Sequence, residues 1–354
     1  MASSTFPHPR QLLRMGPHDR SHWPALRVVV SVLAPLVVVT AADRQDLALF
    51  AVFGAFASVY GRAESHRSRF RSQAVVGAGL VVCIGAGAAV ATAGAVRPWL
   101  AVVVAALIAA LGSLASDALR WRPPGSFFLV FAFGAVASVP TPEGLGRHVL
   151  VAVGVSAAAA AFAVAVGTVG AIPAGNRRLT PPPPAAFAAT LRRPGAWLHA
   201  SRYLIGALVA GGIATAAGLG HPYWAALTAV VPMAAPDTTT RLLRAGHRLI
   251  GTAFGLVVAA GLLALHPTGW LLVGIVGAAQ FGAELFVMRN YSLTLLFVTP
   301  LALLMTALGG NVDPSQLLVD RAIETVLGVA VGIGATLLWS ERERSDLAGP
   351  GSRS

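Results

Sequence analysis

The feature that most limits the possible folds is a series of apolar blocks, each about 15 to 25 residues long, separated by short polar breaks. Hydrophobic residues make up 56% of the 354 positions and charged residues only 11%, whereas soluble domains carry about 25% charged residues. Inside a bilayer every backbone polar group has to find its hydrogen-bond partner within the protein, so apolar blocks of this length predict membrane-spanning α-helices. We therefore expect an all-α polytopic membrane protein.

Twelve such blocks predict about twelve transmembrane helices. Their expected positions are 25–41, 46–60, 73–95, 98–116, 125–140, 147–170, 203–219, 222–236, 249–265, 267–283, 291–309 and 320–340. The longest break, 171–201, is rich in proline and arginine and is expected to be a cytoplasmic linker. It separates a first six-helix half, 25–170, from a second, 202–340, with tails at 1–24 and 341–354.

The two halves show a weak internal repeat. Arg147 and Gly154 open one span with the same seven-residue step as Arg321 and Gly328, at an offset of 174 residues. With six spans in each half, the repeats have to be parallel and related by an axis along the membrane normal. The sequence thus predicts two parallel six-helix repeats.

The basic residues indicate the orientation, and all 26 of them are arginines. If the N-terminus is cytoplasmic, 22 arginines fall on the cytoplasmic side of the predicted spans, and the other side receives only Arg44, Arg97, Arg147 and Arg321. This separation follows the positive-inside rule, so we expect both termini in the cytoplasm. The basic N-terminus and the short apolar stretch 28–39 also look like a secretory signal, but the many spans that follow favour a first transmembrane helix.

The second span of each half is short. Fifteen residues lie between Asp46 and Arg62, and fifteen between His221 and Asp237. At 1.5 Å per residue such a helix covers about 22 Å, less than the hydrocarbon thickness of about 30 Å. Short or interrupted segments at matching positions of two repeats indicate the binding site of a transporter. The break at Pro236-Asp237 is therefore a candidate lining for a polar path.

The residues at this break suggest an anionic cargo. The arginines at 241, 244 and 248 are spaced to share one helical face, and guanidinium groups bind carboxylates with paired hydrogen bonds. Nearby aromatic side chains, including Phe254, offer flat surfaces for a ring. The candidate substrate-binding residues are Tyr223, Trp224, Asp237, Thr240, Arg241, Arg244 and Arg248. The alternative is that these arginines only set the topology.

Three acids are candidates for carrying protons, because a carboxyl group in a low dielectric can hold one. They are Glu284, Asp320 and Glu324, with Arg321 placed to pair with Glu324. The alternative is that they are interfacial caps. His221 and the histidine of His266-Pro267 are expected to be solvated residues of outer turns.

Motifs for enzymatic chemistry are missing from the sequence. Without lysine there is no P-loop, and HExxH, CxxC and GxSxG do not occur. We expect no enzyme, cofactor or metal. The +12 net charge lies in breaks between spans, which predicts contact with membrane lipid and not with nucleic acid. Small-residue helix faces permit close packing and make a homo-oligomer a further expectation.

The stretch YWAALTAVVPMAAPDTTTRLLRAGHRLIGTAFG, 223–255, resembles the signature of the fusaric acid resistance, or aromatic acid exporter, family of bacterial inner-membrane proteins. The segment DRAIETVLGVAVG, 320–332, is similar to the closing segment of that family, and LALFAVFGAFASVYGRAESHRSRFRSQAVVGAG resembles the first unit more loosely. The resemblance implies efflux of aromatic carboxylic acids across the inner membrane, coupled to protons and sometimes assisted by accessory periplasmic proteins. This chain departs from the larger exporters because it lacks a sizeable cytoplasmic domain.

We therefore expect a secondary transporter that exports organic, in particular aromatic carboxylic, anions. A passive anion channel would use the same basic residues, and a related membrane organisation occurs in plant anion channels of the malate type. A third possibility is a non-transporting scaffold whose arginines bind anionic lipid headgroups.

Overall fold

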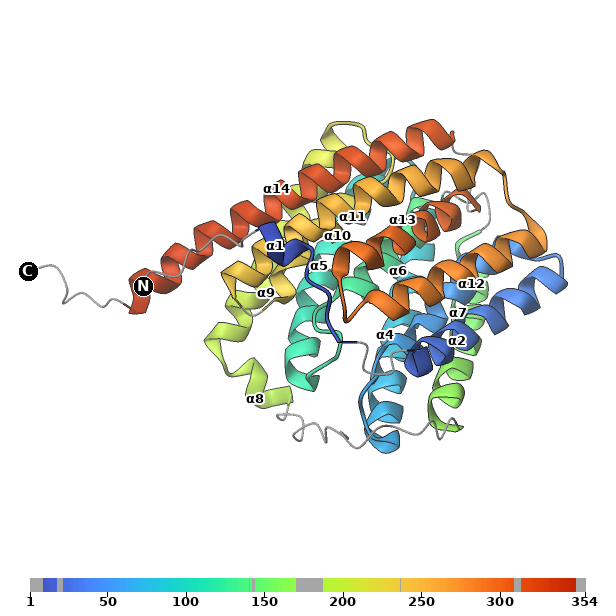
Figure 1. The fold of residues 1–354 in the computed structure, drawn as a ribbon, viewed down its shortest axis with the longest axis horizontal. Coiled ribbons are helices and arrows are strands. Elements are labelled where there is room, and N and C mark those ends of the chain that lie inside the picture. Colours follow the sequence, from blue (N-terminus) through green and yellow to red (C-terminus); the bar gives the residue numbers. More distant parts are fainter. Residues whose placement is uncertain are drawn as a thin grey trace, which may run out of the picture.

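The computed structural model describes residues 9–17, 22–139, 141, 144–169, 187–235, 237–308 and 313–347, and these residues form a bundle of helices without a strand (Figure 1). Most of the predicted linker, 170–186, lies outside the described residues, as do Pro236 and the ends of both tails. Two short helices, α1 (Pro9–Leu12) and α8 (Phe187–Leu191), accompany the apolar ones.

Each of the twelve apolar blocks contains a helix. In the first half these are α2 (His22–Ala41), α3 (Ala48–Ala55), α4 (His66–Ala91), α5 (Arg97–Leu119), α6 (Phe127–Ser138) and α7 (Leu145–Val169). In the second half they are α9 (Pro194–Ala216), α10 (Tyr223–Val230), α11 (Thr238–Ala264), α12 (Gly269–Phe286), α13 (Tyr291–Leu308) and α14 (Pro314–Leu347). Short 3-10 turns adjoin some of them: η1 (Gln45–Leu47), η2 (Phe56–Val59), η3 (Gly94–Val96) and η4 (Pro232–Ala234).

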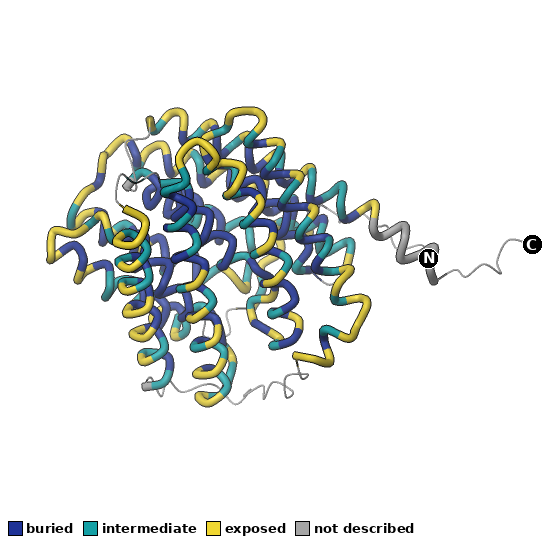
Figure 2. The backbone as a smooth tube through the Cα atoms, turned by 180° about the vertical axis from the view of Figure 1, so that it is seen from behind, coloured by how far each residue is buried: buried dark blue, intermediate teal, exposed yellow. Residues whose placement is uncertain are grey.

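Seven of these helices are long and apolar enough to cross a membrane, and four shorter apolar segments accompany them. The outer surface supports the same conclusion, because large apolar side chains such as Val82, Leu111 and Val257 point outward. Figure 2 shows exposed residues around the periphery and buried ones in the interior. A contiguous apolar surface of this kind is suited to lipid and not to water. The chain is a multi-pass membrane protein, while the arrangement of twelve spans in two repeats stays a prediction.

The two halves use the same packing pairs. In the first half α4 packs against α6 and α7, and α3 packs against α7. In the second half α11 packs against α13 and α14, and α10 packs against α14. The fourth helix of each half crosses over: α5 packs against α9, and α12 packs against α2, so each half contributes a helix to the other's packing (Figure 1).

The short helices α3 and α10 occupy the interior of the bundle. All eight residues of α3 and all eight of α10 are buried, as expected of helices that are apolar around their whole circumference. Each continues into a short 3-10 turn, η2 or η4, and then into extended backbone at Tyr60 or Ala235. The predicted interruption of the second span is thus present in both halves.

Close contact between α10 and α14 depends on a glycine. A Cβ atom at Gly328 would lie 2.5 Å from the carbonyl oxygen of Ala225 and 2.6 Å from Cβ of Thr228. Both contacts are far shorter than ordinary van der Waals distances, and the oxygen belongs to the backbone of a buried helix. Only glycine at this position lets the two backbones approach so closely.

We therefore predict that Gly328→Ala lowers the stability of the folded protein by roughly 1–3 kcal/mol, the usual cost of overpacking. The matched control is Gly334→Ala on the same helix, where a Cβ would meet nothing within 4 Å. Thermal unfolding in detergent measures both, and equal melting temperatures for the two variants would contradict this account of the contact.

Candidate functional site

A group of polar and aromatic side chains, all buried except the half-buried Tyr291, lies where α10 packs against α14. We call it the central polar cluster, and its members are His221, Trp224, Thr228, Arg248, Tyr291, Asp320, Arg321 and Glu324. Its charged members are almost fully enclosed, since Arg248 is 1% exposed, Arg321 2% and Glu324 0%. Charges are buried at a large cost unless they are paired or hydrogen-bonded, so their partners decide what the cluster can do.

Arg321 contacts an aromatic ring instead of an acid. Its guanidinium carbon lies 4.9 Å from the ring centroid of Trp224, a cation–π geometry. Its Nε and Nη1 atoms have no hydrogen-bond partner among the described residues. The predicted pair between Arg321 and Glu324 does not occur among the ion pairs of the described part of the chain. An unpartnered buried donor costs about 1–3 kcal/mol, and more when it is charged.

Arg248 connects three helices from the first third of α11. Its Nη1 donates to the hydroxyl of Tyr291 at 3.0 Å, and its Nη2 donates to Oγ1 of Thr228 at 3.1 Å. Its guanidinium also lies 5.7 Å from the ring centroid of Phe127. These contacts hold the guanidinium inside the bundle, with Nε left unpartnered among the described residues.

The two acids of α14 differ in how well they are satisfied. Asp320 accepts hydrogen bonds from the backbone N–H of Gly220 at 3.0 Å and from the side-chain amide of Gln316 at 2.6 Å. Glu324 accepts one hydrogen bond, from the backbone N–H of His221 to Oε1 at 3.2 Å, and its Oε2 has no partner among the described residues. Of the two, Glu324 is therefore the carboxyl with free hydrogen-bonding capacity.

His221 is buried, so its prediction as a solvated residue was wrong. The imidazole stacks on Trp224 with 4.6 Å between ring centroids, and its Nδ1 lies 3.6 Å from a carboxylate oxygen of Asp320. Burial lowers the pKa of His221, and the nearby Asp320 carboxylate opposes the shift without cancelling it. The other histidine of the pair, His266, is exposed as expected.

The remaining candidates of the 223–248 stretch lie at different depths. Tyr223 is buried, with its hydroxyl 3.4 Å from that of Thr306. Arg244 and Thr240 are partly buried and Asp237 is exposed. The predicted shared face of the arginines holds, but Arg248 lies about 10 Å further along the helix axis than Arg241. Phe254 faces away from this site and is 64% exposed, which removes it as a ring-binding surface.

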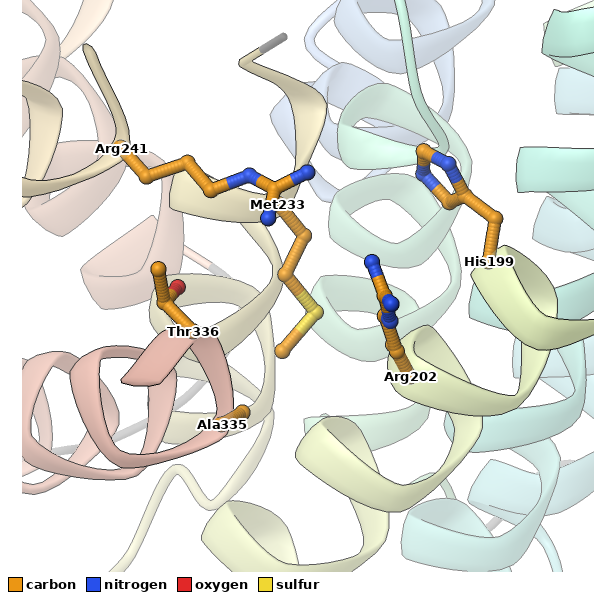
Figure 3. A pocket seen from close by; sticks show the side chains of 6 residues that line it. All are labelled: His199, Arg202, Met233, Arg241, Ala335 and Thr336. Carbon is orange, nitrogen blue, oxygen red and sulfur yellow. The ribbon is translucent and has the colours of Figure 1, made fainter. Parts of the chain in front are cut away.

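A second basic site lies at the end of α10 that carries the break. Figure 3 shows a pocket lined by His199, Arg202, Met233, Arg241, Ala335 and Thr336, which come from α9, η4, α11 and α14. Arg241 also donates from Nε to the carbonyl oxygen of Ala235 at 3.0 Å. Nδ1 of His199 lies 3.8 Å from a carboxylate oxygen of Asp117. Sequence reasoning did not select Arg202 or His199, because their distance from the break along the chain is large.

Glu284 belongs to a different group. Its carboxylate pairs with Arg62 at 2.7 Å and accepts from the amide of Gln280 at 3.3 Å. Arg62 also donates to the backbone oxygen of Glu284 at 2.9 Å, so the pair joins the two halves of the chain. Arg289, five residues further along the chain than Glu284, donates to the carbonyl oxygen of Gly16. Among the described residues, no group of three potential metal ligands occurs.

Comparison with known proteins connects this site to a family. Residues 208–335 match the family described as fusaric acid resistance protein-like, which confirms the resemblance over that segment. The segment contains α10, α11 and every charged residue of the central polar cluster. The chain is thus a multi-pass membrane protein with a segment typical of the fusaric acid resistance protein-like family.

Three relatives align with part of the chain. The uncharacterized membrane protein YvaC of Bacillus subtilis (strain 168) is 30% identical over 144 residues, 40% of this chain and 23% of the relative. The uncharacterized protein slr1298 of Synechocystis is 29% identical over 138 residues, covering 38% and 18%. An uncharacterized protein of Haemophilus influenzae is 32% identical over 120 residues, covering 34% and 16%. The chain therefore aligns with less than a quarter of each relative's length, and no solved structure matches it.

The break itself is stabilised by a helix cap. The carboxylate of Asp237 accepts from the backbone N–H of Thr240 at 2.8 Å and from its hydroxyl at 2.7 Å. This is the standard N-cap arrangement, and these hydrogen bonds from Thr240 lower the pKa of Asp237. Asp237 and Thr240 thus have a structural role as a helix cap, and this role explains their presence at the break without requiring that they bind a substrate.

We predict that Asp237→Ala destabilises the protein by about 1 kcal/mol at pH 7, whereas Asp237→Asn, which retains the capping oxygen, costs much less. Because the folded-state pKa is lowered, the stabilisation from the ionised cap is present above the unfolded-state pKa of about 4 and is lost as the pH falls through the folded-state value. Thermal unfolding across this acidic range measures it. An identical acid response in the wild-type protein and Asp237→Asn would contradict the assignment.

Proposed function

We propose that the protein is a secondary transporter that exports organic anions, with aromatic carboxylic acids as the leading substrate class, across a bacterial inner membrane. The observation that carries this proposal is the pair of enclosed arginines, Arg248 and Arg321, in a membrane-embedded bundle where neither forms an ion pair with a described acid. Polar and ionisable residues inside a membrane protein mark substrate and ion pathways.

The proposal includes twelve spans in two parallel six-helix repeats. The recurrence of the same helix pairs in both halves supports it, as does the exchange of α5 and α12 between the halves. Shorter segments such as α3 and α10 are tolerated at membrane depth because surrounding helices enclose them. The arginine distribution then orients the chain with both termini in the cytoplasm.

This orientation predicts that a fluorescent protein which folds only in the cytoplasm remains bright when it is fused after Ser354. The same reporter inserted at Gly144, in the turn that precedes α7, should stay dark, because this orientation assigns that turn to the outer side of the membrane. The measurement is whole-cell fluorescence normalised to the amount of fusion protein. A dark C-terminal fusion with normal abundance would reverse the topology.

In this orientation the basic pocket lies at the cytoplasmic end of α10, and His221 and Asp320 lie at the outer end. An anion would first meet Arg202 and Arg241, then Arg248, and then Arg321. A membrane potential of 100 mV, negative inside, favours outward movement of one negative charge by about 2.3 kcal/mol. The potential therefore supplies a driving force for export whenever the anion crosses without an accompanying proton.

Proton coupling is part of the proposal, and the three candidate acids are suited to it unequally. Glu284 is held in an ion pair with Arg62, and Asp320 accepts two hydrogen bonds. Glu324 alone among them has a carboxylate oxygen without a partner in the described residues. We therefore assign proton binding to Glu324. A homo-oligomer and accessory envelope proteins stay predictions.

We predict that Arg241→Gln and Arg248→Gln each reduce efflux of radiolabelled benzoate from cells about ten-fold or more, because each removes a charged contact that an anion would use. Arg71→Gln is the matched control, since Arg71 is an exposed arginine on the same predicted side. Protein abundance in the membrane is measured for each variant by immunoblotting.

The same experiment separates the alternatives. If the arginines act only as topology signals, Arg71→Gln and Arg241→Gln will behave alike and efflux will persist in both. Reconstituted protein that passes steady anion current without a pH gradient would replace the coupled exporter with a passive channel. Absence of both flux and current in active preparations would favour the lipid-binding scaffold.

A further inference from the structure

The central polar cluster contains more hydrogen-bond donors than its own acceptors satisfy. Nε and Nη1 of Arg321, Nε of Arg248 and Nε1 of Trp224 are all buried and have no partner among the described residues. Arg321 lies over the ring of Trp224, and Arg248 bonds to Thr228 on the same helix as Trp224, so these donors belong to side chains that surround α10. Unpartnered donors of this kind, three of them on cations, call for an acceptor that carries negative charge.

The two guanidiniums converge on one side of α10. Arg321 contacts Trp224 and Arg248 contacts Thr228, positions that are one helical turn apart. Four residues correspond to about 6 Å along the helix axis, so the two guanidiniums contact neighbouring turns of α10. Both guanidiniums are enclosed, so little solvent screens the repulsion between them. Two cations so close in a low dielectric repel each other unless an anion lies between them.

Neither of the nearby acids neutralises the two arginines by direct pairing. Asp320 is bonded to Gly220 and Gln316 and faces His221. Glu324 accepts from the backbone of His221. Neither acid forms an ion pair with Arg248 or Arg321 in the described part of the chain. The cluster is therefore built with a position for a negative group that the protein does not itself fill.

We propose that Arg248 and Arg321 jointly bind one monovalent anionic group, and that in transport this group is the carboxylate of the substrate. The inference rests on the proposed function and adds Arg321 to the substrate-contacting residues. Trp224 holds the guanidinium of Arg321, while Thr228 and Tyr291 hold that of Arg248. The site lies deeper than the basic pocket of Figure 3, whose lining includes neither arginine.

Glu324 makes this binding depend on protons. Glu324 follows Arg321 by three residues on the same face of α14, and its Oε2 has no partner among the described residues. An ionised Glu324 therefore competes with an external carboxylate for the same guanidinium. The other groups facing it are Asp320 on its own helix, His221 before α10 and Arg248 on α11, while Arg97 of α5 acts on His221. Protonation of Glu324 removes the competition, so anion affinity rises as the pH falls and Glu324→Gln imitates the protonated state.

The test is isothermal titration calorimetry of the purified full-length protein in detergent, with sodium benzoate as the probe and sodium chloride in a separate titration. Arg321→Gln should weaken benzoate binding about ten-fold or more, Glu324→Gln should strengthen it and abolish its pH dependence, and Arg71→Gln should change neither. Arg321→Lys keeps the charge but loses the planar fork, so it should show intermediate binding. Size-exclusion chromatography and thermal unfolding confirm that each variant is folded.

Unchanged benzoate affinity in folded Arg321→Gln or Arg321→Lys overturns the site. The site is also overturned if chloride binds in a manner that depends on Arg321 and benzoate does not displace it. The site would then serve an inorganic anion. Binding that is sensitive to Arg321 in a protein that moves no benzoate in proteoliposomes supports the site and refutes the transport proposal. Efflux that survives Arg321→Gln refutes the site and leaves the transport proposal standing.

Discussion

The burial of two guanidinium groups against α10 is the constraint on which the rest of the second half depends. Arginine keeps its charge in proteins, so Arg248 and Arg321 have to be stabilised by what surrounds them. The structure uses aromatic faces and hydroxyls: Trp224 beneath Arg321, and Thr228 and Tyr291 around Arg248. All these contacts require α10 to be enclosed and to lie close to α14, which Gly328 permits.

The same helix packing serves different chemistry in the two halves. Arg147 and Arg321 hold matching positions in the predicted repeat, but Arg147 is exposed and Arg321 is enclosed. At the same 174-residue offset, the position of Glu324 is occupied in the first half by Leu150, which is 74% exposed. The first half thus has the same packing pairs without the charged cluster. This asymmetry agrees with the family match, which covers 208–335 in the second half.

The basic and acidic groups divide into three places with distinct roles. The Arg62–Glu284 pair joins the halves through a bond between residues 222 positions apart. The basic pocket around Arg202 and Arg241 lies at the break that follows α10, and the central polar cluster lies deeper between α10 and α14. The guanidiniums of the central polar cluster are enclosed, and in a low-dielectric interior each of their contacts is electrostatically stronger than it would be in water.

By itself, the sequence determined the class of fold, because the length and polarity of the apolar blocks leave a membrane-embedded chain few options other than helices. It also located the interruption after α10, since proline and the capping pattern of Asp237 and Thr240 act locally. The depth of each arginine was decided only by tertiary packing: Arg241, Arg244 and Arg248 share a helical face, yet only Arg248 is fully enclosed. The same holds for His221 and for the partners of Arg321 and Glu284. The environment of each of these side chains is set by helices that lie far away along the chain, 222 positions in the case of Arg62 and Glu284, and spacing within one segment carries no information about them.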